Sequence, residues 1–369
     1  MNYWVDLGLA KGDFFVGRTK VEFKLDQKPT GQDLFLDFRG VKIGNYQING
    51  QDALADGKKL FAGQHVALPT ALLKEGQVNT VEMLFLNKYK SDGEGLHSFV
   101  DKEDSRQYLY TQFEPACAHQ VFPCFDQPDL KATWQLSAMT DGEWTVISNE
   151  AEIEDAAAQQ TLSKSMDDAL QLFPDSGIAF TDRKGAIFQQ SFKISTYLYA
   201  IVAGPFGFHE RAAVDGSPRM RIYARQSLLG DVRHEDMFTA TQCGIDFYEK
   251  YFGRAYPFRK YDQVFVPEHN AGAMENVGCV TYNEVYLYRG QNPTLAKRLR
   301  FTITNLHELA HMWFGDLVTM KWWNDLWLNE AFATFMSFLV MRISEPLEQY
   351  HATCWVTFMQ YKFWGISTD

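Results

Sequence analysis

The strongest constraint on this chain is a pair of histidines four residues apart, His307 and His311, in the segment His-Glu-Leu-Ala-His. On an α-helix, side chains at this spacing lie on one face, one turn apart. Both imidazoles can then reach a single Zn²⁺, while the carboxylate of Glu308 lies beside the metal. Glu330 follows on a second apolar stretch and is the candidate third ligand, which leaves a fourth position for water. The segment therefore predicts a helix-borne zinc site.

The same pattern also has a plain structural interpretation, a chance match on an amphipathic helix. A pattern with three fixed positions occurs by accident in roughly one chain in a hundred of this length. Glu330 favours the metal site, because charged residues are rarely buried without a partner. We expect one helix between Pro293 and Gly315. A second would begin at Asn324 or Asp325, and a connection of about nine residues would let the two pack antiparallel.

The second helix is expected to turn an apolar face inward and to end before Pro346. A spacing of three to four residues between apolar side chains is typical of a helix packed on a core. The residues expected on the inward face are Leu328, Ala331, Phe335, Phe338, Leu339 and Ile343.

Length and charge bound the class of protein. The chain has 369 residues, 46% of them hydrophobic, which is enough for two domains that each bury a core. Its net charge of −11 argues against a nucleic-acid partner. An acidic protein is compatible with substrates that carry a free ammonium group. The oligomeric state is open.

The sequence also suggests a compartment. No stretch approaches the roughly 20 apolar residues of a membrane span, and the N-terminus lacks the basic and apolar regions of a signal peptide. The five cysteines have no Cys-x-x-Cys spacing, which indicates free thiols. The one Asn-x-Ser/Thr site, at Asn292, is blocked by Pro293. We expect a cytoplasmic protein without a membrane segment.

The first part of the chain reads as β-structure. Apolar residues alternate with polar ones in several runs, as at Val21, Phe23 and Leu25, and turn residues separate the runs, which predicts antiparallel sheets. Asn49-Gly50 predicts a hairpin turn. Residues 150–170, rich in Ala, Glu, Asp, Gln and Ser, look like a solvated excursion. A helical period replaces the alternation near residue 207, so we expect domains at 1–207 and 208–369.

Two loops stand out. Residues 269–276, His-Asn-Ala-Gly-Ala-Met-Glu-Asn, lie between two β-like runs, 260–266 and 278–288. Glycine allows close backbone approach there, and a glutamate in such a loop often faces a ligand. A tight turn with a solvated Glu275 is an equal alternative. Residues 110–128 are the second loop, rich in proline, and read on their own as a connection between sheets.

Taken together, these motifs resemble the M1 family of zinc aminopeptidases. Gly272-Ala273-Met274-Glu275-Asn276 is similar to the family's exopeptidase signature. His307-Glu308-x-x-His311, with eighteen residues before Glu330, is similar to its zinc motif. Gln112-Phe113-Glu114 and the Pro-Cys-Phe-Asp-Gln-Pro segment at 123–128 resemble its N-terminal segment, and 256–262 looks most like the aminopeptidase N branch. The resemblance covers nearly the whole chain.

The resemblance implies a fold and a metal site. The implied fold is a saddle-like antiparallel β N-domain followed by a thermolysin-like α+β catalytic domain. His307, His311 and Glu330 would hold one zinc ion per chain. Glu308 would act as the general base toward a zinc-activated water. The implied activity is the release of N-terminal amino acids from peptides.

The resemblance also implies how a peptide with a free N-terminus would be bound. Glu275, assisted by Glu114, would hold the α-ammonium group. The loop residues Gly272, Ala273, Met274 and Asn276 would bind the peptide. Two carboxylates at the amine would set its distance from the zinc, so that only the first peptide bond is in register.

The chain departs from the family pattern in places. His119-Gln120 stands where the family commonly has two arginines, and Val277 where it often has an aromatic residue. The family's transition-state tyrosine lies beyond the third ligand, and this chain ends at Asp369 before reaching it, so we expect a truncated sequence. Two other functions stay open: a fragment that binds zinc or peptides without turnover, and an epoxide hydrolase of the leukotriene A4 hydrolase branch.

Overall fold

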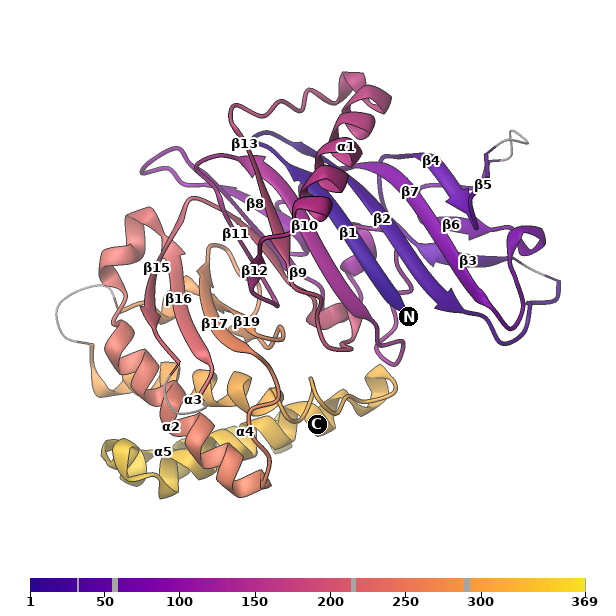
Figure 1. Cartoon of the computed structure of the whole chain (residues 1–369). Helices are drawn as coiled ribbons and strands as arrows, with labels where there is room; N and C mark the ends of the chain where they lie inside the picture. Colours follow the sequence, from indigo (N-terminus) through magenta and orange to yellow (C-terminus); the bar gives the residue numbers. More distant parts are fainter. Residues whose placement is uncertain (32, 55–58, 214–216, 289–292, 369) are drawn as a thin grey trace. The chain divides into compact units, whose positions relative to one another are not determined.

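The computed structural model describes residues 1–31, 33–54, 59–213, 217–288 and 293–368 (Figure 1). The chain divides into two compact units, Met1–Phe206 and Gly207–Asp369. The first unit is rich in β-strands and the second combines a sheet with long helices, which is the β then α+β organisation that the sequence predicts. The expected division into domains 1–207 and 208–369 stays a prediction.

The first unit is built on an eight-stranded sheet. Its order is β12-β13-β10-β1-β2-β7-β4-β5, and all neighbours pair antiparallel except β1 and β10. Asn49 and Gly50 have φ values of 54° and 79° in the turn between β4 and β5, as the predicted hairpin requires. The strands are β1 (Asn2–Leu9), β2 (Phe14–Lys24), β4 (Lys42–Ile48), β5 (Gln51–Asp52), β7 (Val78–Lys88), β10 (Thr133–Asp141), β12 (Glu152–Ile153) and β13 (Arg183–Phe188).

Smaller sheets complete this unit. A four-stranded sheet has the order β11-β14-β9-β8, and β3 pairs with β6. Aromatic rings fill the space between strands: Tyr3 stacks on Trp134 at 4.0 Å, and Trp134 stacks on Tyr199 at 4.8 Å. The elements are β3 (Leu34–Asp37), β6 (His65–Leu68), β8 (Gly95–Val100), β9 (Gln107–Gln112), β11 (Thr145–Ser148) and β14 (Ile201–Gly204), with 3-10 helices at Thr70–Leu72, Ala118–Gln120, Pro174–Ser176 and Thr196–Leu198.

The expectation that residues 150–170 form a solvated excursion from the fold is wrong. Residues Ala156–Leu172 form helix α1, and Asp155 caps it by accepting a hydrogen bond from the amide of Ala158 at 2.9 Å. Leu162, Met166 and Ala169 recur at helical spacing and are buried against the eight-stranded sheet. The many small and polar residues between them hid this short apolar stripe.

The second unit has a five-stranded sheet of order β15-β16-β17-β19-β18. Strands β16, β17 and β19 are parallel, and β18 closes one edge antiparallel to β19. Every residue of the central strand β17 is buried, as parallel strands covered on both faces require. The strands are β15 (Phe206–Arg211), β16 (Arg219–Arg225), β17 (Lys260–Val266), β18 (Ala273–Met274) and β19 (Cys279–Asn283).

Among the described residues of this unit, four α-helices accompany the sheet. Thr294 caps α3 through its side chain, one residue after Pro293, as expected for a helix that starts there. Helix α3 ends at His311 rather than Gly315, so the connection to α4 is longer than predicted and includes a 3-10 turn. The elements are α2 (His234–Phe252), α3 (Leu295–His311), α4 (Leu326–Ile343) and α5 (His351–Thr368), with 3-10 helices at Gln226–Asp231, Glu284–Tyr286, Trp323–Asp325 and Glu345–Tyr350.

The predicted inward face of α4 is mostly wrong. Leu328, Phe335 and Ile343 are 50%, 39% and 56% exposed, and of the expected set only Phe338 is fully buried. The face that packs inward carries Asn329, Ala333, Met336, Ser337, Phe338, Val340 and Met341. The helix is apolar on nearly all sides, so hydrophobicity alone does not define its buried face.

This helix also corrects the expectation that no apolar stretch approaches the length of a membrane span. The segment Trp323–Ile343 is long and apolar enough to cross a membrane by length and composition, with 39% of its most apolar window buried. A core helix of a water-soluble domain passes the same test. Here the segment carries Glu330, and α4 packs against α3.

Candidate active site

The three predicted metal ligands come together within the second unit. Nε2 of His307 lies 3.2 Å from Oε2 of Glu330, and Nε2 of His311 lies 3.6 Å from Oε1 of the same carboxylate. The two Nε2 atoms are 3.0 Å apart. The histidines belong to the last turns of α3 and Glu330 to the second turn of α4. The antiparallel packing of the two helices therefore brings three potential ligand atoms to one point.

Hydrogen bonds on the other ring nitrogens orient both imidazoles. Nδ1 of His311 donates to the carbonyl oxygen of Phe314 at 3.0 Å, because a carbonyl can only accept. When the ring is neutral, Nε2 of His311 therefore holds a lone pair. Nδ1 of His307 lies 3.2 Å from the hydroxyl of Thr334, which can accept in the same way. Thr334 and the turn at Phe314 were not predicted from the sequence.

The donor set fits zinc. Ligands about 2.0–2.1 Å from a tetrahedral zinc lie roughly 3.3–3.4 Å from one another, close to the separations of these three residues. Burial lowers the pKa of His307 and of His311, which favours the neutral rings that a metal needs. Burial raises the pKa of Glu330, but the two histidines outweigh it and hold that pKa below its ordinary value. Two lone pairs and a carboxylate facing one another are an arrangement that a cation stabilises.

Glu308 lies on the same helix, one residue after His307. It is 5% exposed. Its charge contributes to raising the pKa of the nearby Tyr282, after the larger effect of burial. A carboxyl group that is shielded from solvent and lies on the same helix as the two candidate histidine ligands is a candidate general base, and the role itself stays a prediction.

The loop expected to face a ligand carries a buried glutamate. Glu275 is 3% exposed, which excludes the alternative of a turn with a solvated side chain. Burial, together with the carboxylate of Glu330, raises the pKa of Glu275 to about 8. Its Oε1 atom has no hydrogen-bond partner among the residues that the structure describes. A buried carboxylate oxygen without a donor calls for an explanation, and a bound cation is one of them.

Strand β18 holds the residues just before Glu275. Ala273 and Met274 pair with Tyr282 and Thr281 of β19, and the amide of Asn283 donates to the carbonyl of Gly272 at 2.9 Å. β18 is an edge strand of its sheet. A side chain at Gly272 would meet the hydroxyl of Tyr286 at 2.8 Å, so this position favours glycine.

A small hydrogen-bond network around Thr281 fixes the loop. Nε2 of His269 and the amide nitrogen of Asn276 lie 3.1 Å and 3.2 Å from the Thr281 hydroxyl. Nδ1 of His269 accepts from the amide of Ala271 at 3.1 Å, so Nε2 carries the proton and donates. Asn283 donates to the carbonyl of His269 at 2.8 Å. The role of His269 was not predicted, although it opens the motif.

Glu114 belongs to the first unit. It lies two residues after the end of β9 and is half-buried. Of the two residues that replace the family's arginines, His119 lies nearby in the chain and its Nδ1 is 2.8 Å from Oδ2 of Asp126. The predicted joint action of Glu114 and Glu275 stays a prediction.

Comparisons with known proteins agree with the motifs. Residues 2–166 match the peptidase M1 N-terminal domain and residues 237–365 the peptidase family M1 domain. Aminopeptidase N of Streptomyces lividans is 39% identical over 100% of this chain and 39% of its own length.

Two further relatives come from other kingdoms of life. Endoplasmic reticulum aminopeptidase 1 of Rattus norvegicus is 35% identical over 90% of this chain and 34% of its own length. Tricorn protease-interacting factor F2 of Thermoplasma acidophilum is 34% identical over 83% of this chain and 34% of its own length. The chain spans about a third to two fifths of the length of these three relatives. Both domain models and these relatives lead to one conclusion: the chain belongs to peptidase family M1.

Proposed function

We propose that this protein is a zinc-dependent aminopeptidase that removes residues from the free N-terminus of peptides. The observation that carries the proposal is the convergence of His307, His311 and Glu330, whose ligand atoms all lie within 4.8 Å of one another. Membership of peptidase family M1, and relatives named as aminopeptidases, support the reaction class.

The residues around the proposed metal divide the chemistry between them. Zinc held by these three residues supplies a Lewis acid that polarises a carbonyl and lowers the pKa of a water to about 7. Glu308 accepts the proton of the attacking water and later returns it to the leaving amine. The hydrogen bonds that the two Nδ1 atoms make with the carbonyl of Phe314 and the hydroxyl of Thr334 hold the imidazoles in the orientation and tautomer that ligation needs.

Selectivity for the N-terminus comes from Glu275. Its carboxylate is buried and Oε1 lacks a donor among the described residues, so a substrate ammonium would supply the missing partner. An ammonium bound there would also lower the pKa of Glu275 and favour the charged carboxylate. Glu114 is the proposed second carboxylate for the amine. The edge of β18, at Gly272, Ala273 and Met274, offers backbone groups for the extended peptide, and Asn276 completes the binding loop.

The test combines metal content with turnover in the protein at its natural length. We expect about one zinc per chain and hydrolysis of an aminoacyl reporter such as a leucine anilide. Glu308→Gln should keep the zinc and lose turnover by about 100-fold or more. The matched control is Glu345→Gln, an exposed glutamate of the second unit, with turnover unchanged.

Two other outcomes of this test would support the alternative functions, a binding protein without turnover or an epoxide hydrolase. Zinc binding without reporter turnover would identify a binding protein. Turnover of an epoxide in place of the reporter would identify an epoxide hydrolase. The predicted cytoplasmic location is a separate question, checked by fractionation of native cells.

A further inference from the structure

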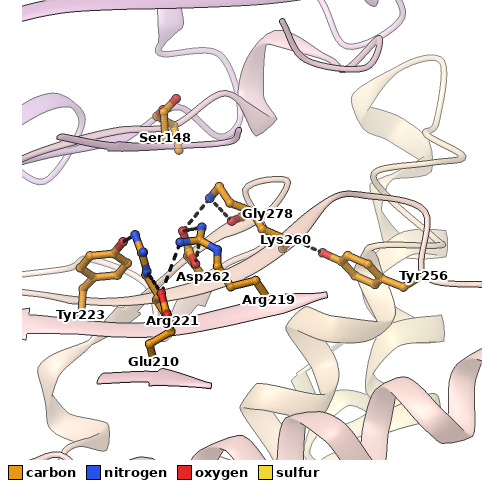
Figure 2. A network of polar contacts seen from close by, with 10 residues as sticks. Ser148, Glu210, Arg219, Arg221, Tyr223, Tyr256, Lys260, Asp262 and Gly278 are labelled. Atoms are coloured by element: carbon orange, nitrogen blue, oxygen red, sulfur yellow. Dashed lines mark hydrogen bonds and ion pairs between the residues drawn. The ribbon is translucent and has the colours of Figure 1, made fainter. Parts of the chain in front are cut away.

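A buried lysine lies next to the loop that carries Glu275 (Figure 2). Lys260, the first residue of β17, is only 3% exposed. Its ammonium group donates to Oδ2 of Asp262 at 2.8 Å and to the carbonyl oxygen of Gly278 at 2.7 Å. Lysine is rarely this buried, because its charge loses its hydration. The contacts of this ammonium group therefore indicate a specific task.

An ion network holds the ammonium group in place. Asp262 is 1% exposed, and Nη2 of Arg219 lies 3.4 Å from its Oδ2. Nη1 of Arg219 lies 3.8 Å from Glu210, which also pairs with Arg221. These residues come from three adjacent strands of one sheet, β15, β16 and β17. Figure 2 shows the contacts between their side chains. Side chains of the sheet therefore hold the ammonium group of Lys260 on one side, and the turn at Gly278 accepts from it on the other.

The carbonyl of Gly278, to which Lys260 donates, belongs to the turn that follows Glu275. The amide of Cys279 donates to the carbonyl of Asn276 at 2.9 Å, which closes a four-residue turn with Gly278 in its third position. Gly278 has a φ of 65°, as the third position of a type II turn requires. Its carbonyl accepts from both Lys260 and the amide of Asp262, the latter at 3.1 Å.

Glu275 is therefore held from both sides. On its N-terminal side, Ala273 and Met274 are paired with β19. On its C-terminal side, the turn is held by Lys260. A buried ion pair is often no more stabilising than apolar residues of the same volume. Stability alone therefore does not account for a charged residue at position 260, whereas fixing the turn does.

We propose that Lys260 is a positioning residue: through Gly278 it fixes the turn that aims Glu275 at the α-ammonium group of the substrate. The proposal rests on the aminopeptidase function proposed above. Lys260 does not touch the substrate in this account. Its loss should weaken recognition of the amine and leave the zinc ligands on α3 and α4 in place.

The test is Lys260→Met, which keeps the side-chain length and removes the charge and the donors. We expect KM for the aminoacyl reporter to rise about tenfold, with a much smaller change in kcat and unchanged zinc content. The preference for a free-amine peptide over its N-acetylated twin should fall by a similar factor. The matched control is Lys250→Met, an exposed lysine on α2, with KM unchanged.

A second variant covers the case in which Lys260→Met does not fold. Asp262→Asn keeps the side-chain volume and removes the charge that pairs with Lys260. It should raise KM by about threefold with zinc retained. Unchanged KM and unchanged amine preference in a folded Lys260→Met, or in Asp262→Asn if the first is insoluble, overturns the proposal. If the parent protein itself shows no preference for a free amine, the proposed function fails and the role of Lys260 fails with it.

Discussion

Nδ1 of His311 donates a hydrogen bond of 3.0 Å to the carbonyl oxygen of Phe314, three residues further along the chain. The helix that carries the histidine ends at His311, and the chain turns at once. Phe314 lies in this turn, beyond the last residue of the helix, and its carbonyl oxygen accepts from the imidazole. The end of α3 orients the ring and leaves its Nε2 facing His307 and Glu330.

The first prediction concerns the metal. His311→Ala should lower bound zinc from about one to less than about 0.1 per chain, because two ligands alone hold the ion poorly. Elemental analysis after gel filtration measures this. The control is His65→Ala in the first unit, whose side chain is 56% exposed, with zinc unchanged. Equal zinc in His311→Ala and the parent would refute the ligand assignment.

The second prediction concerns the orientation of His307. Thr334→Val removes the hydroxyl 3.2 Å from Nδ1 with little change in volume. Zinc affinity should fall by about 10- to 100-fold, as for other residues that orient a metal ligand. Competition with a chromophoric chelator measures the affinity. Thr239→Val, at an exposed position on α2, should leave it unchanged; the same result in Thr334→Val would mean that the hydroxyl has no such role.

A third prediction tests helix α1, which the sequence did not reveal. Leu162 is fully buried between α1 and the eight-stranded sheet. Leu162→Ala should lower the free energy of unfolding of the first unit by about 2–5 kcal/mol, since it leaves a cavity. Denaturant titration followed by tryptophan fluorescence measures it. Gln171→Ala, exposed on the same helix, should change stability by less than about 0.5 kcal/mol. Similar values for the two variants would place α1 outside the core.

Sequence reasoning succeeded where one short segment decides the structure. The spacing of His307 and His311 needs only a helix, and Asn49-Gly50 needs only a tight turn, so both were predictable. Family membership followed from the same short motifs. Each of these patterns is read without knowing what packs against it.

It failed where the answer depends on the packing partner. The buried face of α4 is set by α3, and its apolar residues surround the helix, so Phe335 was assigned to the wrong side. The contacts of Thr334, His269 and Lys260 join segments that are distant in the chain or adopt irregular turns. Residue type alone does not reveal such partners.

The fourth prediction uses the cysteines, all five of which are described and free. Burial raises the pKa of Cys117 to about 11 and that of Cys279 to about 12. Only the thiolate reacts with a disulfide reagent, so at pH 8 these thiols should be inert, and their reactivity should rise only as the pH approaches those values.

The measurement is a thiol titration with Ellman's reagent at pH 8. Cys243 is half-buried while the other four are buried, so the native protein should expose one slowly reacting thiol. Guanidinium should release all five. Cys243→Ser serves as the control and should abolish the native reaction. Rapid reaction of several thiols before unfolding would contradict the burial described for Cys117 and Cys279.

The central claim is that the buried carboxylate of Glu275 directs a zinc site to the first peptide bond. Its most direct test is a time course by mass spectrometry on a peptide of about ten residues, with a free or an acetylated N-terminus, using the protein at its natural length. The account predicts stepwise loss of single residues from the free peptide and at least about 100-fold slower cleavage of the acetylated one, because the ammonium contact with a buried charge is lost. Equal cleavage of the two peptides, or internal fragments from either, would contradict it.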